Sequence, residues 1–168
     1  MFEEGSVKSV QYGEVLEGET VTLTSVILTT DPKVSSTGQG FWVQDAGGGE
    51  WSGIRVYVYD TASTDLGIAE GSVVDITGTV AEYHDATQIQ IAEVDIATGI
   101  VSLDGIEPIT VDPIDAATVL DWEAWEGCLI QVEDVVVGAD MDYGEYSIDV
   151  GALAGAMHID DMIWSGMD

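Results

Sequence analysis

The amino-acid sequence predicts an all-β protein. Six segments are rich in β-branched and aromatic residues and alternate apolar with polar positions, which is typical of strands. Clusters of Gly, Asp and Ser separate these segments, and only one stretch of the chain has helical spacing. The predicted strands span residues 19–30, 41–45, 53–59, 72–83, 87–98 and 128–137.

The helical stretch follows Pro113 and covers about residues 114–125. Asp115 is placed to cap its first turn, and apolar residues then recur near the helical period. We expect one short helix here, which crosses a barrel end or joins two β units. Its tryptophans, Trp122 and Trp125, are assigned to core packing, with a ligand platform as the alternative.

The chain length of 168 residues allows a hydrophobic core without a disulfide framework. The single cysteine, Cys128, excludes an intrachain disulfide bond. Its surroundings, GCLIQVEDVVV, predict a strand. The thiol is therefore expected to be buried and inert, with a nucleophile as the alternative.

Charge is the strongest compositional signal. There are 32 acidic residues against Lys8, Lys33 and Arg55, and residues 56–168 contain 24 carboxylates but no Lys or Arg. Because 46% of the residues are hydrophobic, the chain is not a disordered acidic tail. Three interpretations stay open: a hydrated surface of the halophile type, a surface that collects divalent cations, or simple solubility of a secreted domain. In each of them, self-repulsion makes cations important for stability.

No run of 18 apolar residues exists, so no membrane span is predicted. The first residues, MFEEGSVKSV, lack the basic and then apolar regions of a signal peptide. The chain is therefore expected to be either cytoplasmic or the mature part of a secreted protein. The resemblance described below favours an extracellular or cell-surface location.

An internal repeat emerges when LEGETVTLTSVILT is aligned with WEGCLIQVEDVVVG at an offset of 109 residues. Further on, GFWVQD, from Gly40, is echoed by GEYSID, from Gly144. The second copy is shorter than the first and lacks its last two strands. Chance similarity between two strands is the alternative explanation.

The repeat predicts how the chain is divided. We expect a β-barrel in residues 1–110, followed in residues 111–168 by a linker helix and a truncated second β unit. A half-built sheet has unpaired edges. The second unit is therefore expected to pack on the first or to be completed by another subunit.

Three stretches carry a family resemblance: GFWVQDAGGGEWSGIRVYVYD, EGSVVDITGTVAEYHDATQI, and WEGCLIQVEDVVV with YGEYSID. They resemble the OB-fold-like domains of bacterial secreted and surface proteins, including those beside extracellular nuclease domains. The resemblance covers about residues 12–150, with Ser72 where the family pattern has Asp. It implies an OB-like five-stranded barrel, an extracellular setting and, in some relatives, association with nucleic acid. Its motifs specify architecture better than activity.

A stripe of side chains forms the predicted ligand site. Alternation places Arg55, Tyr57 and Tyr59 on one face of a strand, as a binding surface or an interface. Nucleic acid fits poorly, because an OB groove needs several basic residues and only Arg55 lies here. Carbohydrate on tryptophan platforms stays open, and Arg55 is expected to pair with an acid of another molecule or of a neighbouring strand. The predicted ligand-binding residues are Trp42, Trp51, Arg55, Tyr57 and Tyr59.

No catalytic motif is present, and His84 and His158 are far apart in the sequence, so no enzymatic activity is predicted. Carboxylate clusters instead suit a divalent cation, with calcium as the first candidate and solvated turns as the alternative. The predicted metal ligands are Asp140, Asp142 and Glu145 in one cluster and Asp160 and Asp161 in another, with Asp45 and Glu50 as a third pair.

Two functional hypotheses follow. The first is a non-catalytic extracellular structural module that associates with other copies of itself, as a homo-oligomer or filament, through open β edges and with divalent cations. The truncated repeat, the hydrophobic content and the unopposed charge motivate it. The second is an accessory domain of a secreted hydrolase that binds nucleic acid or carbohydrate on the face of Trp42, Tyr57 and Tyr59.

Overall fold

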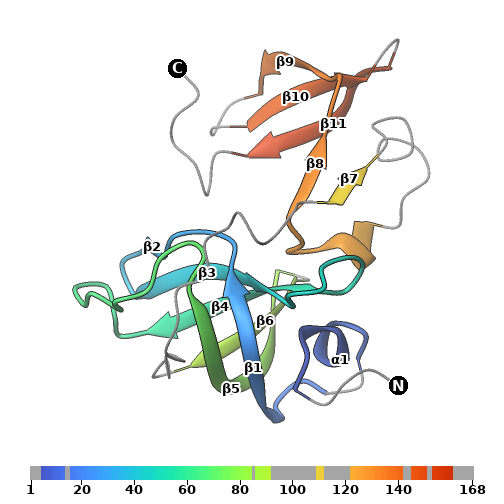
Figure 1. Ribbon diagram of the computed structural model, residues 1–168. Helices are drawn as coiled ribbons and strands as arrows, with labels where there is room; N and C mark the ends of the chain where they lie inside the picture. Colours follow the sequence, from blue (N-terminus) through green and yellow to red (C-terminus); the bar gives the residue numbers. More distant parts are fainter. Residues whose placement is uncertain are drawn as a thin grey trace. The chain divides into compact units, whose positions relative to one another are not determined.

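The structure is a computed structural model, and most of the residues that it describes lie in strands, which confirms the all-β fold class. It divides into two units, each described here by itself (Figure 1). Among the described helices, none has the length and hydropathy of a membrane span. The described residues are 5–13, 16–84, 86–91, 109–111, 122–141, 145–150 and 153–160. Unit 1 comprises Met1–Pro108 and Glu123–Leu129, and unit 2 comprises Ile109–Trp122 and Ile130–Asp168.

Unit 1 contains a closed five-stranded barrel. Its strands are β1 (Thr20–Leu28), β3 (Gly38–Gln44), β4 (Gly53–Tyr59), β5 (Val73–Tyr83) and β6 (Ala86–Ile91), and the short β2 (Lys33–Val34) extends the sheet beside β3. The order is β1–β5–β6–β4–β3, and β3 pairs back onto β1. The pair of β4 and β6 is parallel, and the other pairs are antiparallel. The third barrel strand thus lies beside the fifth, and the first lies between the second and the fourth. This is the OB order, so the predicted OB-like barrel is confirmed.

A bulge allows β1 to close the barrel. The pairing of β1 with β5 shifts between Leu23 and Val26, and Ser25 there has a positive φ of 54°. The amide of Ser25 donates to Oδ1 of Asp75 at 2.7 Å, which holds the bulge against β5. Beyond the bulge, the end of β1 pairs with β3 as well as with β5. Bulges bend strands in this way at barrel corners.

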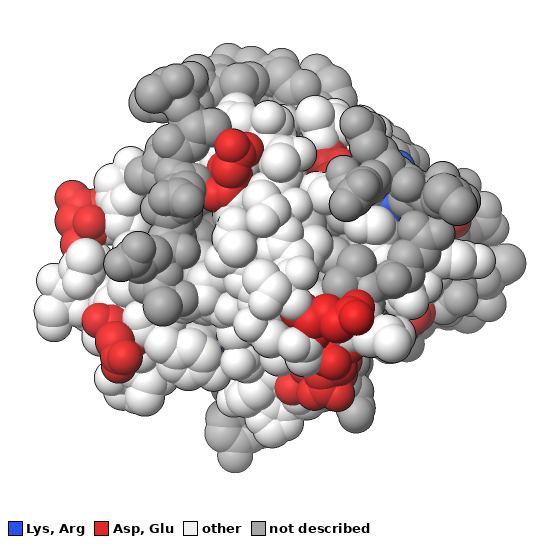
Figure 2. Space-filling model, turned by 90° about the horizontal axis from the view of Figure 1, so that it is seen from below, with Lys and Arg blue, Asp and Glu red and all other residues white. Residues whose placement is uncertain are grey.

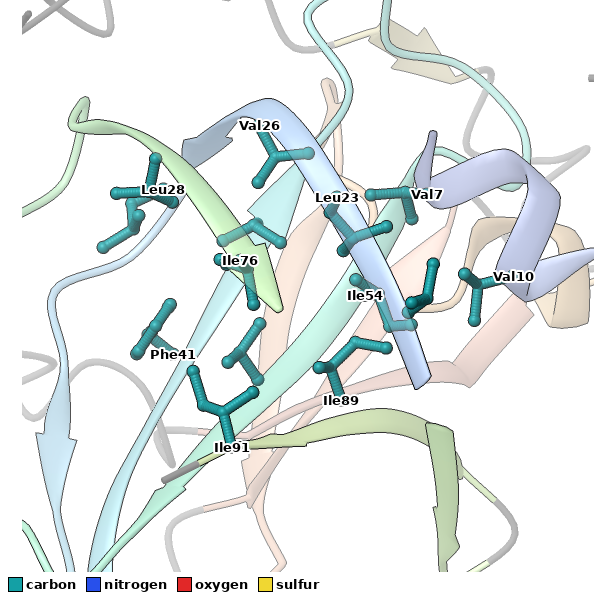
Figure 3. Packing of buried hydrophobic residues seen from close by; sticks show 14 of the residues in the cluster. Val7, Val10, Leu23, Val26, Leu28, Phe41, Ile54, Ile76, Ile89 and Ile91 are labelled. Atoms are coloured by element: carbon teal, nitrogen blue, oxygen red, sulfur yellow. The ribbon is translucent and has the colours of Figure 1, made fainter. Parts of the chain in front are cut away.

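Apolar residues from every strand fill the barrel. Figure 3 shows Phe41 of β3, Ile54 of β4 and Ile76 of β5 gathered with Ile89 of β6 in one cluster, and none of these four is exposed to solvent. Ile76 and Ile89 come from positions that alternate with polar residues along their strands, as the sequence pattern predicts. The core of unit 1 therefore lies inside the barrel, and the alternate residues face outward.

A short helix, α1 (Val7–Gln11), covers part of this core. Val7 and Val10 are buried and belong to the same cluster (Figure 3). The carboxylate of Asp45 accepts the amide protons of Val7 at 2.9 Å and Lys8 at 3.2 Å. The sequence analysis missed α1, because five residues are too few to show a helical period.

The expected helix at residues 114–125 is described only at its end, where Trp122–Trp125 forms the 3-10 helix η2. The rest of it lies outside the described residues. Residues 123–129 belong to unit 1, where the amide of Leu129 donates to Oε1 of Gln44 at 2.7 Å. The indole nitrogen of Trp125 is buried there and makes no hydrogen bond.

Unit 2 contains two small sheets. Strand β7 (Ile109–Val111) pairs in parallel with β8 (Ile130–Val132). The other sheet is antiparallel, in the order β9 (Val136–Asp140), β10 (Glu145–Val150) and β11 (Leu153–Asp160). The single strand predicted at residues 128–137 is thus divided into β8 and β9. The division lies at Asp134, whose φ is 56°.

We expect Gly53→Ala to destabilise unit 1. A Cβ atom at Gly53 would overlap the backbone of Gly127 and Cys128. Overpacking of this kind destabilises by about 2–3 kcal/mol, which thermal unfolding would measure. Gly47→Ala is the matched control, because no atom lies within 4 Å of a Cβ at Gly47. Equal melting temperatures for both variants would contradict the packing of residues 123–129 on β4.

Candidate ligand-binding site

Arg55 lies at the centre of a row of side chains that crosses three strands of unit 1. In the sheet register it is opposite Trp42 of β3 on one side and Gln88 of β6 on the other. Tyr57 is two residues further along β4 and so faces the same way. Its partner on β3 is Gly40. The register therefore gathers one cation, two aromatic rings and an amide on the outer face of the barrel.

Three aromatic rings surround the guanidinium group. The Cζ atom of Arg55 lies 5.7 Å from the ring centroid of Trp42, 5.2 Å from that of Tyr57 and 5.6 Å from that of Tyr83. All three distances are within the range of cation–π attraction, which is worth about 0.5–1 kcal/mol per pair at exposed sites. We call Trp42, Arg55, Tyr57, Tyr83 and Gln88 the Arg55 cluster.

The hydrogen bonds of Arg55 leave much of its donor capacity unused. Nη1 donates to Oε1 of Gln88 at 2.6 Å, and Gln88 is itself buried. Nε is buried and makes no hydrogen bond. Within the described part of the chain, no carboxylate forms an ion pair with Arg55. The expected cross-strand acid is therefore absent there, since the two cross-strand neighbours are Trp42 and Gln88.

Gly40 allows the arginine to lie close to the sheet. A Cβ atom at this position would be 3.2 Å from Nη2 of Arg55 and 3.5 Å from the ring of Tyr57. The first contact is tight enough to move the guanidinium by a few tenths of an ångström, whereas the second is an ordinary van der Waals contact. The glycine thus keeps Arg55 between the rings of Trp42 and Tyr57, where the cation–π distances are short.

A groove lined by hydroxyl groups adjoins the cluster. The phenol of Tyr57 forms hydrogen bonds with Oγ of Ser35 at 2.6 Å and Oγ1 of Thr37 at 2.7 Å, and its ring meets that of Tyr59 edge to face at 4.9 Å. Thr37 and Tyr59 in turn line an open cavity of about 530 Å³. We call this cavity the hydroxyl groove; its lining residues are Ser36, Thr37, Tyr59, Asp60, Ala62, Ser63 and Thr64.

The structure brings together four of the five predicted ligand residues. Trp42, Arg55 and Tyr57 belong to the Arg55 cluster, and Tyr59 continues it into the hydroxyl groove. Trp51 lies apart from them. Its ring contacts Tyr12 edge to face at 5.5 Å, and its backbone has a positive φ of 65° before β4 begins. Whether any of these residues binds a ligand stays a prediction.

Tyr83, Gln88 and Gly40 were not among the predicted ligand residues, and Tyr83 joins the cluster from the end of β5. Gln88 joins it through the parallel pairing of β4 with β6, and Gly40 through the antiparallel pairing with β3. The polar glutamines that alternate with isoleucines in TQIQI were the available signal, because alternation marks one face of a strand.

The predicted metal clusters stay predictions. Asp140 and Glu145 end β9 and begin β10, and Glu145 lies opposite Asp160 of β11 in the register. Asp142 and Asp161 lie outside the described residues. Within the described ranges, no three His, Cys, Asp or Glu side chains come together as metal ligands. On the face in Figure 2, acidic side chains likewise lie in small separate groups.

Three further residues that the sequence singled out, Asp45, Cys128 and His84, have definite places in the fold. Asp45, which was predicted to bind a cation together with Glu50, accepts hydrogen bonds from the amides that begin α1. Cys128 follows η2 and precedes β8, so its expected place in a strand is wrong, and it is partly buried near the carbonyl of Gly49 at 3.4 Å. His84 lies in the turn between β5 and β6.

Similarity to known proteins is found among solved structures and does not show a family for this chain. No known family model and no curated protein matches the chain. The OB domain, residues 67–166, of MM0293 from Methanosarcina mazei is 18% identical, with 55% of this chain and 84% of that chain covered and a TM-score of 0.41. A replication protein A heterotrimer bound to single-stranded DNA is 16% identical, with 55% and 65% covered and a TM-score of 0.37.

Acidic residues border the Arg55 cluster at β6. Glu82 accepts a hydrogen bond from Oγ1 of Thr87 at 2.7 Å, and Glu126 accepts one from the amide of the same residue. Partial burial raises the pKa of Glu126, and the nearby charges of Glu123 and Glu82 raise it further. Protonation of Glu126 is therefore easier in the folded protein than in the unfolded chain.

The raised pKa of Glu126 predicts a pH effect on stability. Its stabilising contribution is fully present below the usual pKa of 4.5 and is lost as pH rises through the higher folded-state pKa. At pH 7, Glu126→Gln should raise the melting temperature, on the order of 2 °C, because the amide carries no charge but still accepts a hydrogen bond. The exposed Glu17→Gln is the control for the lower net charge. If both variants gain equally at pH 7 and at pH 4, local burial of Glu126 is not the cause.

Proposed function

We propose that this chain is a non-catalytic binding module whose β3–β4 face holds a saccharide with a carboxylate group. The observation that carries the proposal is Arg55, a cation enclosed by aromatic rings and without a carboxylate partner in the described part of the chain. In the OB fold, the face of the second and third barrel strands is where ligands bind. Those strands are β3 and β4 here.

The unused donors of Arg55 favour an anionic group. A guanidinium has five N–H donors, and a planar carboxylate accepts two of them side by side. Within the described residues, the side chain of Arg55 makes one hydrogen bond, to the neutral Gln88. A bound carboxylate would neutralise the charge of Arg55 in a partly buried site. Hydrogen bonds to charged groups contribute about 1.5–3 kcal/mol.

The neighbouring groove favours a sugar as the carrier of that carboxylate. Its threonine and serine hydroxyls and the carboxylate of Asp60 offer hydrogen bonds to sugar hydroxyls, and the ring of Tyr59 is 43% exposed for stacking. A single-stranded nucleic acid presents a phosphate at every residue, whereas this face offers one cation in a chain of net charge −29. The aromatic rings of this face could stack on nucleic-acid bases, so single-stranded DNA is the second candidate.

The extracellular setting, the attachment to a secreted hydrolase and the calcium sites belong to the same proposal. Calcium at the carboxylates of Asp140 and Glu145 is tested by thermal unfolding of the chain in calcium and in a chelator, with Asp140→Asn as the variant. Identical melting temperatures under both conditions would remove calcium from the proposal.

We expect Arg55→Gln to weaken binding of an oligogalacturonate about ten- to a hundredfold, the equivalent of one lost charged hydrogen-bond pair. Binding of a neutral oligogalactose of the same length should change little. Isothermal titration would measure both, and thermal unfolding would show that the variant is folded. The affinity of Arg55→Lys for the oligogalacturonate should lie between those of the parent chain and of Arg55→Gln, because lysine keeps the charge but loses the planar fork.

Three outcomes would contradict this proposal. The first is that neither saccharide binds, and the second is that both lose affinity equally on Arg55→Gln. The third is that oligo-dT binds more tightly than the oligogalacturonate at physiological salt. The last result would mean that this face binds single-stranded nucleic acid.

Tyr59→Ala tests the groove separately from the cluster. Loss of the exposed ring should weaken both the acidic and the neutral saccharide, on the order of tenfold, because stacking does not depend on the carboxylate. Tyr12→Ala is the matched control, since Tyr12 is 59% exposed and lies against Trp51, away from the groove. Equal losses in the two tyrosine variants would mean that the groove is not the binding surface.

A further inference from the structure

The main sheet of unit 2 repeats three of the five barrel strands of unit 1. Strands β9, β10 and β11 are antiparallel in that order, as β1, β3 and β4 are in the barrel. The backbone conformation agrees with the sequence repeat. At the offset of 109 residues, positive φ angles recur at Ser25 and Asp134, and at Gly18 and Gly127. By this correspondence, β9 matches the part of β1 that follows its bulge.

The strand register supports this correspondence. In unit 1, Leu28 of β1 lies opposite Val43 of β3. In unit 2, the counterpart of Leu28 is Val137, which lies opposite Ile148 of β10. Val43 and Ile148 are both buried. The alignment of GFWVQD with GEYSID puts Val43 beside Ser147 instead, so the structure shifts that part of the repeat by one residue.

The two units differ in what lies beside the first strand. On its other side β1 pairs with β5, and Ile27 and Leu28 are 6% and 0% exposed. Among the strands that the structure describes, β9 pairs with β10 alone. Its residues Val136 and Val137 are 64% and 51% exposed. An apolar strand with one open edge is a template for another strand.

We propose that the open edge of β9 pairs with the β9 edge of a second copy of this chain. A two-fold axis makes two copies of one strand antiparallel, which is also the direction of β5 beside β1. A symmetric contact therefore supplies the kind of neighbour that β1 has in unit 1. The two three-stranded sheets would join into one continuous sheet across the dimer.

Charge makes β9 a suitable place for this contact. Residues 136–139 read VVGA and carry no charge, although the chain has a net charge of −29. Two copies paired about Val137 therefore meet without charge at the axis, whereas Asp134 of one copy lies opposite Asp140 of the other. Their overall charges still repel at low ionic strength, and salt screens that repulsion. The pairing is accordingly weak at low salt and stronger at physiological salt.

Val137→Glu tests the contact, because it places a new negative charge at the proposed dimer axis. The matched control is Val34→Glu on β2, since Val34 is also an exposed valine, at 59%, on a strand that pairs on one side. Both variants change the net charge equally. Light scattering over a concentration series at physiological salt should show dimers of the parent chain and of Val34→Glu, and a dissociation constant at least about tenfold higher for Val137→Glu.

Hydrogen exchange locates the contact without a mutation. Backbone amides of residues 136–140 should exchange more slowly as the chain concentration rises, whereas those of β2 should not change. Monomers at every concentration, or equal effects of the two glutamate variants, would overturn the proposal. So would protection of the amides at the open edge of β9 that is independent of concentration, because another part of the same chain would then cover this edge; the amides that face β10 are protected in any case. None of these results depends on saccharide binding.

Discussion

The bulge at Ser25 is the constraint on which the structure of unit 1 depends. Without it, β1 would stay beside β5 and could not turn to reach β3, so the sheet would remain open. Closure encloses the apolar residues and turns the alternate ones outward. The same closure carries β4 between β3 and β6, and this position gives Arg55 neighbours on two strands. Barrel and candidate site therefore have a common origin.

The surroundings of Arg55 show how an acidic protein can hold a cation without an ion pair to any carboxylate among its described residues. An acid in contact with the arginine would neutralise it permanently, whereas aromatic rings and an amide stabilise it and leave its charge available. Gly40 helps to hold Arg55 in this place because it has no side chain, since a Cβ atom there would lie only 3.2 Å from Nη2 of Arg55. The general excess of carboxylates repels anions over much of the surface, and this contrast is why we propose that a ligand's anion binds beside Arg55.

Local patterns in the sequence were sufficient for the strands and for much of the site. Alternation located β1, β3, β4, β5 and β6 and put Arg55 and Tyr57 on one outward face. It did not reveal Gln88, because a parallel pair of strands joins segments that are distant in sequence. It also joined β8 and β9 into one strand, since a single residue with positive φ, Asp134, leaves no signal in hydrophobic periodicity. The predicted metal ligands Asp140, Glu145 and Asp160 lie at strand ends, where hydrophobic periodicity carries no information about metal binding.

The position of α1 has a consequence for the order of folding. This helix precedes β1 in the sequence, yet its amides bind Asp45, which follows β3, and the side chain of Gln11 donates to the carbonyl of Gly53 at 2.7 Å. During synthesis this segment therefore has no docking site until the residues 37 to 42 positions further on have been made. Val7 and Val10 cannot reach their places in the core before then. Helix α1 thus depends for its docking on segments that are made after it.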